Sequence, residues 1–97
     1  MESPTSAGAC FLAEWYRPEW AEGSVELMLA TLDDAAAKVS ASGTPVRLLA
    51  LFAMPDDALL FGVFTADSAQ AVAQACDRAG MSAQRLTSAA EVHFRTT

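Results

Sequence analysis

The chain has few of the residues that bind metal ions. It contains one histidine and two cysteines in 97 residues. Nickel and zinc sites need several imidazole, thiolate or carboxylate groups converging on one ion. A divalent metal such as nickel would therefore have to bind around the one histidine, His93. Cys10 and Cys76 are too few for a disulfide framework, and we expect both to be free thiols in a cytoplasmic protein.

Recognisable catalytic motifs are also missing. The sequence has no glycine-rich phosphate loop, no nucleophile motif and no metalloprotease signature. Each of these motifs holds reacting groups at a fixed spacing, which scattered Ser and Thr residues cannot replace. Most familiar hydrolases and nucleotide-dependent enzymes are thereby excluded.

Basic residues are scarce as well. Six Lys and Arg stand against twelve Asp and Glu, which gives a formal net charge of −6. Phosphate groups are bound by basic patches, so we expect neither nucleic acid nor an anionic membrane as a partner. No stretch approaches the roughly 20 apolar residues of a membrane span. Residues 1–8 lack the features of a secretory signal, so we expect a disordered lead followed by one domain over residues 9–97.

Apolar residues, by contrast, are abundant. They make up 53% of the chain without counting glycine, whereas ordinary domains reach about 45–50% with glycine included. Because obligate subunit interfaces resemble a domain core cut in half, the excess points to contact with another subunit.

The hydrophobic pattern divides the chain into six segments. Strand-like runs alternate with two amphipathic helices, whose ends are marked by Ser24 and Gly43 for the first and by Asp67–Gln70 and Gly80 for the second. The order βαββαβ with short connections predicts an α+β, ferredoxin-like fold, with a four-stranded antiparallel sheet and both helices on one face. The expected strands are residues 10–17, 46–53, 59–65 and 85–95.

The strands do not alternate apolar with polar residues, as a sheet with one wet face should. Strict alternation in the second strand puts Val46, Leu48, Ala50 and Phe52 on one face, and Leu49, Leu51 and Ala53 on the other. Two helices can cover only one face. We therefore expect a second copy to cover the other, sheet against sheet, in a two-fold homodimer.

Polar residues that interrupt the strands are the candidates for a ligand pocket. A carboxylate such as Glu14 in an apolar cavity would have its pKa raised and could act as a general acid or base. Tyr16 and His93 would then handle protons, and Arg47 or Arg95 would stabilise an oxyanion. The alternative is that Glu14 forms a structural ion pair with an arginine across the interface. The full set is Glu14, Tyr16, Arg47, Glu91, His93 and Arg95.

Three stretches carry a resemblance to a known family: FLAEWYRPEW, GTPVRLLALFAMPDDALLFGVFTADS and AQACDRAGMSAQRLTSAAEV. They resemble a bacterial family of small domains of unknown function, typified by an actinobacterial nickel-binding protein. The resemblance implies a ferredoxin-like fold, a dimer formed through the sheets and a nickel ion as ligand. The sequence departs from the family at three positions: Gly62 and Thr65 replace a cysteine and an acidic residue, and Ala50 replaces a small polar residue that is common in the second strand.

Three functions remain open at this level. The first is a dimeric protein that binds a small ligand or a metal. The second is a cofactor-free enzyme of the monooxygenase, isomerase or cyclase type, with a pocket at the sheet or dimer interface. It predicts an internal cavity of several hundred Å³ lined by Glu14, Tyr16 and aromatic residues. The third is a purely structural interaction module.

Overall fold

The structure is a computed structural model that describes residues 9–16 and 25–89. These residues form strands and helices in the predicted order. A single turn of 3₁₀ helix, η1, joins the second and third strands. The elements are β1 (Ala9–Tyr16), α1 (Val25–Ala41), β2 (Val46–Met54), η1 (Pro55–Asp57), β3 (Leu59–Ala66), α2 (Ala69–Arg78) and β4 (Arg85–Ala89).

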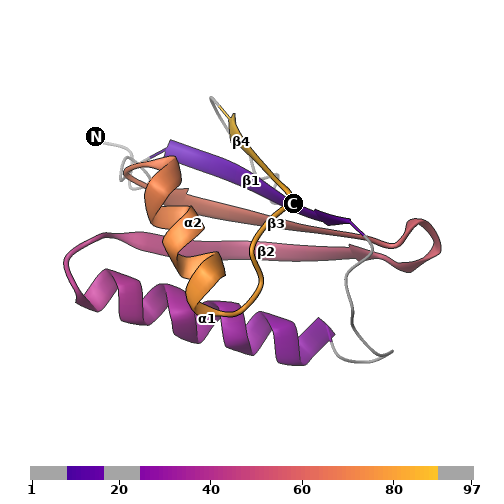
Figure 1. The fold of residues 1–97 in the computed structure, drawn as a ribbon, viewed down its shortest axis with the longest axis horizontal. Helices are drawn as coiled ribbons and strands as arrows, with labels where there is room; N and C mark the ends of the chain where they lie inside the picture. The colour runs from indigo at the N-terminus through magenta and orange to yellow at the C-terminus, as the bar shows by residue number, and fades with distance from the viewer. Residues whose placement is uncertain (1–8, 17–24, 90–97) are drawn as a thin grey trace, which may run out of the picture.

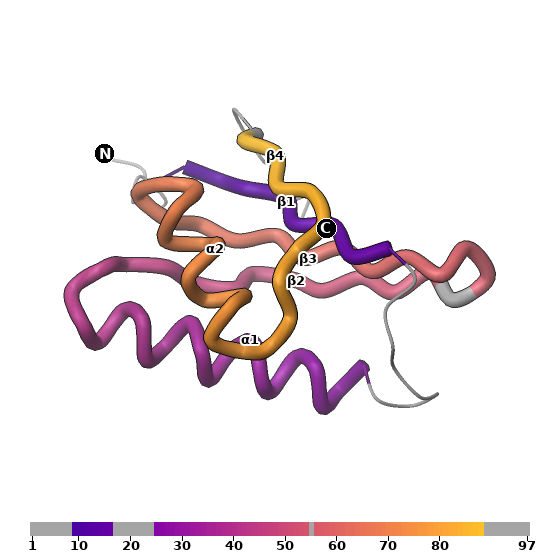
Figure 2. Tube along the Cα trace, viewed as in Figure 1, coloured from indigo at the N-terminus to yellow at the C-terminus, as the bar shows by residue number. Residues whose placement is uncertain are grey.

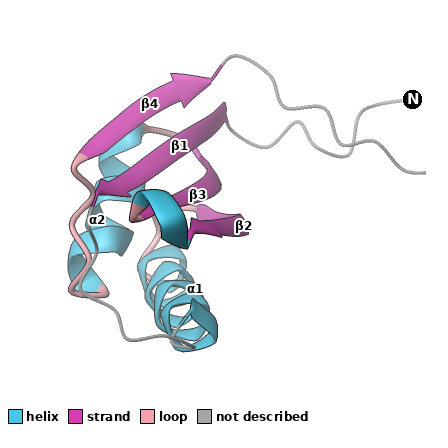
Figure 3. Ribbon diagram, turned by 90° about the vertical axis from the view of Figure 1, so that its right-hand side faces the viewer, coloured by secondary structure: helices cyan, strands magenta, loops and turns pink. Residues whose placement is uncertain are grey.

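The four strands form one sheet in the order β2-β3-β1-β4, with antiparallel neighbours throughout. Helices α1 and α2 lie on the same side of this sheet (Figures 1 and 3). Strand order and helix placement together are those of a ferredoxin-like α+β fold, as the sequence predicted. No helix in the described ranges is long and apolar enough to cross a membrane.

The ends of the helices follow from local chemistry. The N-cap of α2 is Ser68, whose hydroxyl accepts a hydrogen bond from the backbone N–H of Ala71 at 3.2 Å. The sequence pattern favoured the neighbouring Asp67, so the cap lies one residue later than expected. Both helices are followed by a glycine with positive φ, Gly43 at 108° and Gly80 at 75°, a conformation that side chains disfavour.

The hydrophobic core lies between the helices and the sheet. Its largest fully buried side chains are Phe64, Leu32, Leu60, Val72 and Cys76. Burial of each stabilises the fold by roughly 1.5–3 kcal/mol relative to exposure. Contributions come from β3, α1 and α2 alike, so all three elements must be in place before the core is complete.

A β-bulge in β2 reverses the side-chain pattern of that strand. The pairing with β3 shifts by one residue between Leu48 and Ala50. Downstream of the shift Phe52 pairs with Phe61 on the face away from the helices, while Leu51 packs against the core. The prediction of strict alternation along β2 is therefore wrong beyond the bulge. A bulge adds one residue to one strand, and alternation cannot continue through it.

The face of the sheet that points away from the helices is called the open face below. No described element covers it (Figure 3). Figure 2 follows the chain through the β2–β3 hairpin. Residues of this hairpin supply much of the apolar surface of the open face. Phe52 is 52% exposed and Met54 43% exposed. The pairing places on this face Cys10, Leu12, Glu14, Tyr16, Arg47, Ala50, Phe52, Met54, Leu59, Phe61, Val63, Thr65, Arg85 and Thr87.

Candidate functional site

Glu14 lies in the middle of the open face. On β1 it is opposite Phe61 of β3 on one side and Arg85 of β4 on the other. Its neighbours along β1 on the same face are Leu12 and Tyr16, because side chains two residues apart share a face. The side chain of Glu14 is only 16% exposed. A carboxylate is thus held within a mostly apolar surface.

Two side chains of the described residues contact the Glu14 carboxylate. The Tyr16 hydroxyl donates a hydrogen bond of 2.8 Å to Oε1. Nε of Arg85 lies 3.8 Å from Oε2, close enough for an ion pair but too far for a hydrogen bond. The Arg85 side chain is 64% exposed, so solvent screens much of this attraction.

The backbone fixes the strand that carries these groups. The carbonyl oxygen of Glu14 accepts a hydrogen bond from the N–H of Gln84 at 2.9 Å. The Gln84 side-chain oxygen in turn accepts one from the N–H of Tyr16 at 3.1 Å. The end of β1 is therefore tied to the start of β4, which sets the spacing of Glu14, Tyr16 and Arg85.

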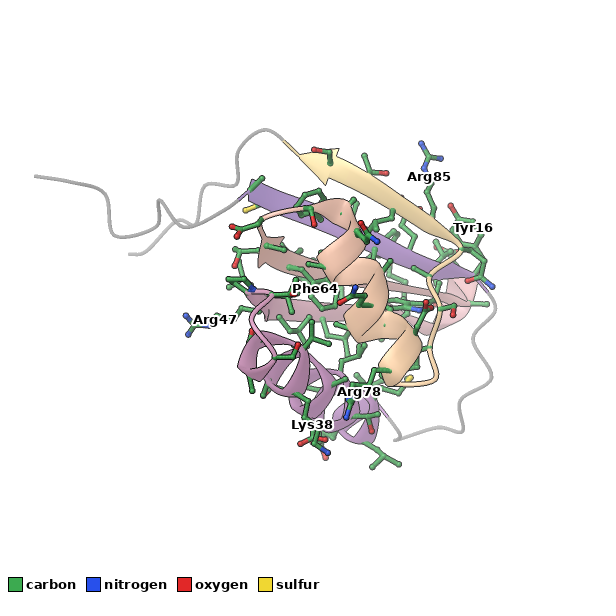
Figure 4. All side chains as sticks on the ribbon, turned by 60° about the vertical axis from the view of Figure 1, so that its left-hand side comes forward. Tyr16, Lys38, Arg47, Phe64, Arg78 and Arg85 are labelled. Carbon is green, nitrogen blue, oxygen red and sulfur yellow. The ribbon has the colours of Figure 1, made fainter. Side chains whose placement is uncertain are left out.

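The other sequence candidates lie elsewhere. Arg47 shares a row of the sheet with Thr65 and Cys10, and Cys10 is four residues from Glu14 along β1, or about 13 Å. Figure 4 shows Arg47 and Tyr16 at opposite ends of the sheet. The structure therefore unites Glu14 with Tyr16 but not with Arg47. The three remaining candidates, Glu91, His93 and Arg95, lie outside the described residues.

Arg85 is the site residue that the sequence reasoning missed. It was expected only as the first residue of the last strand. The sequence signal that could have found it is the alternation of polar and apolar residues in that strand. If the strand pairs with β1, one of its polar residues lies opposite Glu14. Which residue it is depends on the register of the two strands, and that register comes from the structure.

Grooves on the helix side are lined by described residues at two places. One, of about 380 Å³, lies between α1 and the ends of β2 and β3 and includes Arg47. The other, of about 450 Å³, lies between α1 and α2 and includes Lys38 and Arg78. Neither is lined by Glu14 or Tyr16, so neither is the cavity that the enzyme hypothesis predicted. Both are open and bordered by side chains of exposed helix turns.

Metal-binding groups do not gather in the described part of the chain. No group of three or more His, Cys, Asp or Glu side chains there could hold an ion. Gly62 and Thr65, which replace the cysteine and acid of the resembling family, lie on opposite faces of β3, since Gly62 is helix-facing and buried. The metal-binding prediction therefore still rests on His93.

The two cysteines have different surroundings. Cys76 is fully buried, and its pKa is raised to about 12, first by burial and second by the negative charge of Asp77. Its thiol stays protonated at neutral pH and serves as a small apolar group. Cys10 is half-buried at the edge of the open face.

Comparison with known proteins adds a fold relationship. No protein-family model matches the chain, and no curated protein does. Among solved structures the chain is similar to SCO4226 from Streptomyces coelicolor A3(2), with a TM-score of 0.67 and 18% sequence identity. The match covers 91% of this chain and 100% of the other. At this identity the two proteins are shown to share a fold, the ferredoxin-like arrangement of a small bacterial protein, and nothing more.

Proposed function

We propose that the protein is a homodimer that binds a small, mainly apolar molecule between the open faces of its two sheets. The observation that carries the proposal is Glu14, a mostly buried carboxylate that Tyr16 holds within a mostly apolar surface. An interface needs only the apolar residues. A hydrogen-bonded acid at its centre is a feature of ligand sites, where a few polar groups set orientation.

The apolar side chains of the open face support the dimer. Leaving each large one in water forfeits roughly 1.5–3 kcal/mol of the stabilisation that burial would give. Phe52 and Met54 are about half exposed, and Leu12 and Phe61 are partly so. A second copy carries the same patch, so a two-fold axis brings complementary apolar surfaces together without any further partner.

The Glu14 carboxylate supports a space within that interface. Packing a charged group tightly against apolar side chains costs several kcal/mol unless it is fully hydrogen-bonded. Two copies of Glu14 under one cover also repel each other. A cavity that admits a polar group next to Glu14 lowers the first of these penalties, whereas a solid interface does not.

The sequence also allows the dimer to bind a metal ion instead of a small organic ligand. Nickel binding would be detected as a rise in the melting temperature on adding Ni²⁺ that His93→Ala abolishes. We place the small-ligand form of the function first because Glu14 and Tyr16, which carry it, lie within the described residues.

The proposal is tested with N-phenyl-1-naphthylamine, an uncharged dye that fluoresces in apolar surroundings. The wild-type protein should bind it saturably and sediment as a dimer. Phe61→Arg places a charge on the open face and should abolish both properties. Leu27→Arg is the matched control, because Leu27 is 67% exposed on α1, away from the sheet. A dimer that fails to bind the dye would instead indicate a structural module.

A further inference from the structure

We infer that the ligand is an uncharged aromatic alcohol, such as a phenol, whose hydroxyl donates a hydrogen bond to Glu14. This inference rests on the proposed function and specifies the chemistry of its site. It follows from what the polar groups at the centre of the open face can still offer to a ligand.

Glu14 and Tyr16, at the centre of the open face, are left with hydrogen-bond acceptors to offer, whereas Arg85 beside them is a donor that is exposed to solvent. Tyr16 has one hydroxyl proton, and that proton is already donated to Oε1 of Glu14. Within the described residues Oε2 accepts no hydrogen bond, since Nε of Arg85 is 3.8 Å away. An ionised carboxylate is an acceptor only. Among the described residues nothing donates to the Tyr16 oxygen either, so this oxygen and Oε2 of Glu14 select a ligand that donates.

The surroundings of Glu14 favour a flat ring. Phe61 lies directly opposite Glu14 in the sheet, and Phe52 lies opposite Phe61 in the next strand. Leu12 and Val63 continue the apolar surface one row further. Aromatic side chains pack well against a planar ring, edge to face or offset, and the row of two phenylalanines leads directly to the acceptor.

Charge selects against ionic ligands. A carboxylate ligand would meet the negative charge of Glu14 in a chain whose net charge is already −6. A cationic ligand would compete with Arg85, which already faces the carboxylate from β4. A neutral hydroxyl avoids both conflicts and gains a charge-assisted hydrogen bond.

The test compares three molecules with the same two-ring skeleton as competitors of bound N-phenyl-1-naphthylamine. 2-Naphthol has a donor, its methyl ether has none, and 2-naphthoate is an anion. On the wild-type dimer 2-naphthol should compete about tenfold or more better than the ether, since hydrogen bonds to charged acceptors are among the strongest. The naphthoate should be the weakest of the three.

Variants assign the preference to Glu14. Glu14→Leu should bind the dye but lose the preference for naphthol over its ether. Glu14→Gln keeps an acceptor oxygen and should keep part of the preference for naphthol. Glu26→Gln, on the exposed first turn of α1, should change nothing.

The outcomes separate the two proposals. Equal competition by naphthol and its ether on a dimer that binds the dye would overturn the inference and leave the proposed function standing. A preference for the naphthoate would also overturn it and would point to Arg85 as the anchor. Absence of dye binding would remove both.

Discussion

The hydroxyl of Tyr16 donates a 2.8 Å hydrogen bond to the carboxylate of Glu14, two residues earlier on the same face of β1. The pair gives a mostly apolar sheet face an oriented polar group near its centre. In the single chain Tyr16 is 38% exposed, so solvent weakens the bond. In a dimer that covers this face, the same hydrogen bond would satisfy a buried charge. Its contribution to the free energy of association would then be larger.

Loss of the Tyr16 hydroxyl should therefore weaken association more than folding. Tyr16→Phe leaves Glu14 without its donor in the covered interface, which costs about 1–3 kcal/mol. We expect the dissociation constant of the dimer to rise about tenfold, measured by sedimentation. Thr87→Val, which removes another hydroxyl from the open face, should leave the constant nearly unchanged. Equal effects of the two substitutions would argue against a special role for the pair.

Gly62 provides the space that the Trp15 ring occupies. A Cβ at position 62 would lie 3.1 Å from Cζ3 of Trp15 and 3.2 Å from Cε1 of Phe64. The indole cannot easily move, because it is 4% exposed and its Nε1–H donates to the carbonyl oxygen of Met81 at 2.8 Å. Gly62→Ala should lower the free energy of unfolding by about 1–3 kcal/mol.

A double-mutant cycle identifies the cause of that loss. In a Trp15→Phe background the smaller ring leaves room for the methyl group, so Gly62→Ala should cost clearly less, measured by urea denaturation. The same cost in both backgrounds would mean that Trp15 is not the obstacle.

Burial of the Cys76 thiol should make the protein less stable in alkali. Its pKa is raised from 9.0 to about 12. Below about pH 9 both folded and unfolded forms are protonated, so the thiol adds no pH dependence there. Between about pH 9 and pH 12 the unfolded state loses the proton and the folded state keeps it. The free energy of unfolding should then fall by up to about 1.4 kcal/mol per pH unit.

A variant without the thiol isolates this effect from other groups that titrate in alkali. Cys76→Ala should be less stable at neutral pH, but its stability should fall less steeply than that of the wild type between about pH 8 and about pH 10. Parallel curves from urea denaturation would contradict the raised pKa.

Ser40 links the end of α1 to the start of β2. Its hydroxyl donates to the carbonyl oxygen of Val46 at 2.8 Å and accepts from the N–H of Val46 at 3.0 Å. Ser40→Ala leaves both groups of a buried residue without this partner and should cost about 1–3 kcal/mol in thermal or urea unfolding. Ser42→Ala, which removes a hydroxyl from an exposed residue, should cost less. If Ser42→Ala lowered the stability more than Ser40→Ala, water would be replacing both hydrogen bonds of the Ser40 hydroxyl.

Element order and fold class could be predicted from the sequence, because helix caps, glycines after the helices and apolar runs are local signals. The bulge after Leu48 could not, because VRLLALF is apolar at nearly every position and alternation there has no polar residue to mark a change of face. Strict alternation therefore places Phe52 on the face of Leu48, whereas the bulge places it on the opposite face.

The candidate site was predictable in part for a related reason. Glu14 and Tyr16 lie on one strand, and their shared face follows from spacing alone. The pairing of Glu14 with Arg85, and its separation from Arg47, depend on register between strands distant in sequence. Register of that kind is set by the packing of the whole sheet and has no local signature.

Sedimentation of the wild-type protein at micromolar concentration tests most directly whether a second copy covers the open face. If a second copy covers this face, the protein should sediment as a species of about 20 kDa, twice the 10.2 kDa of one chain, which Phe61→Arg converts to single chains and Leu27→Arg does not. A wild-type protein that sediments at 10.2 kDa across the micromolar range would contradict it.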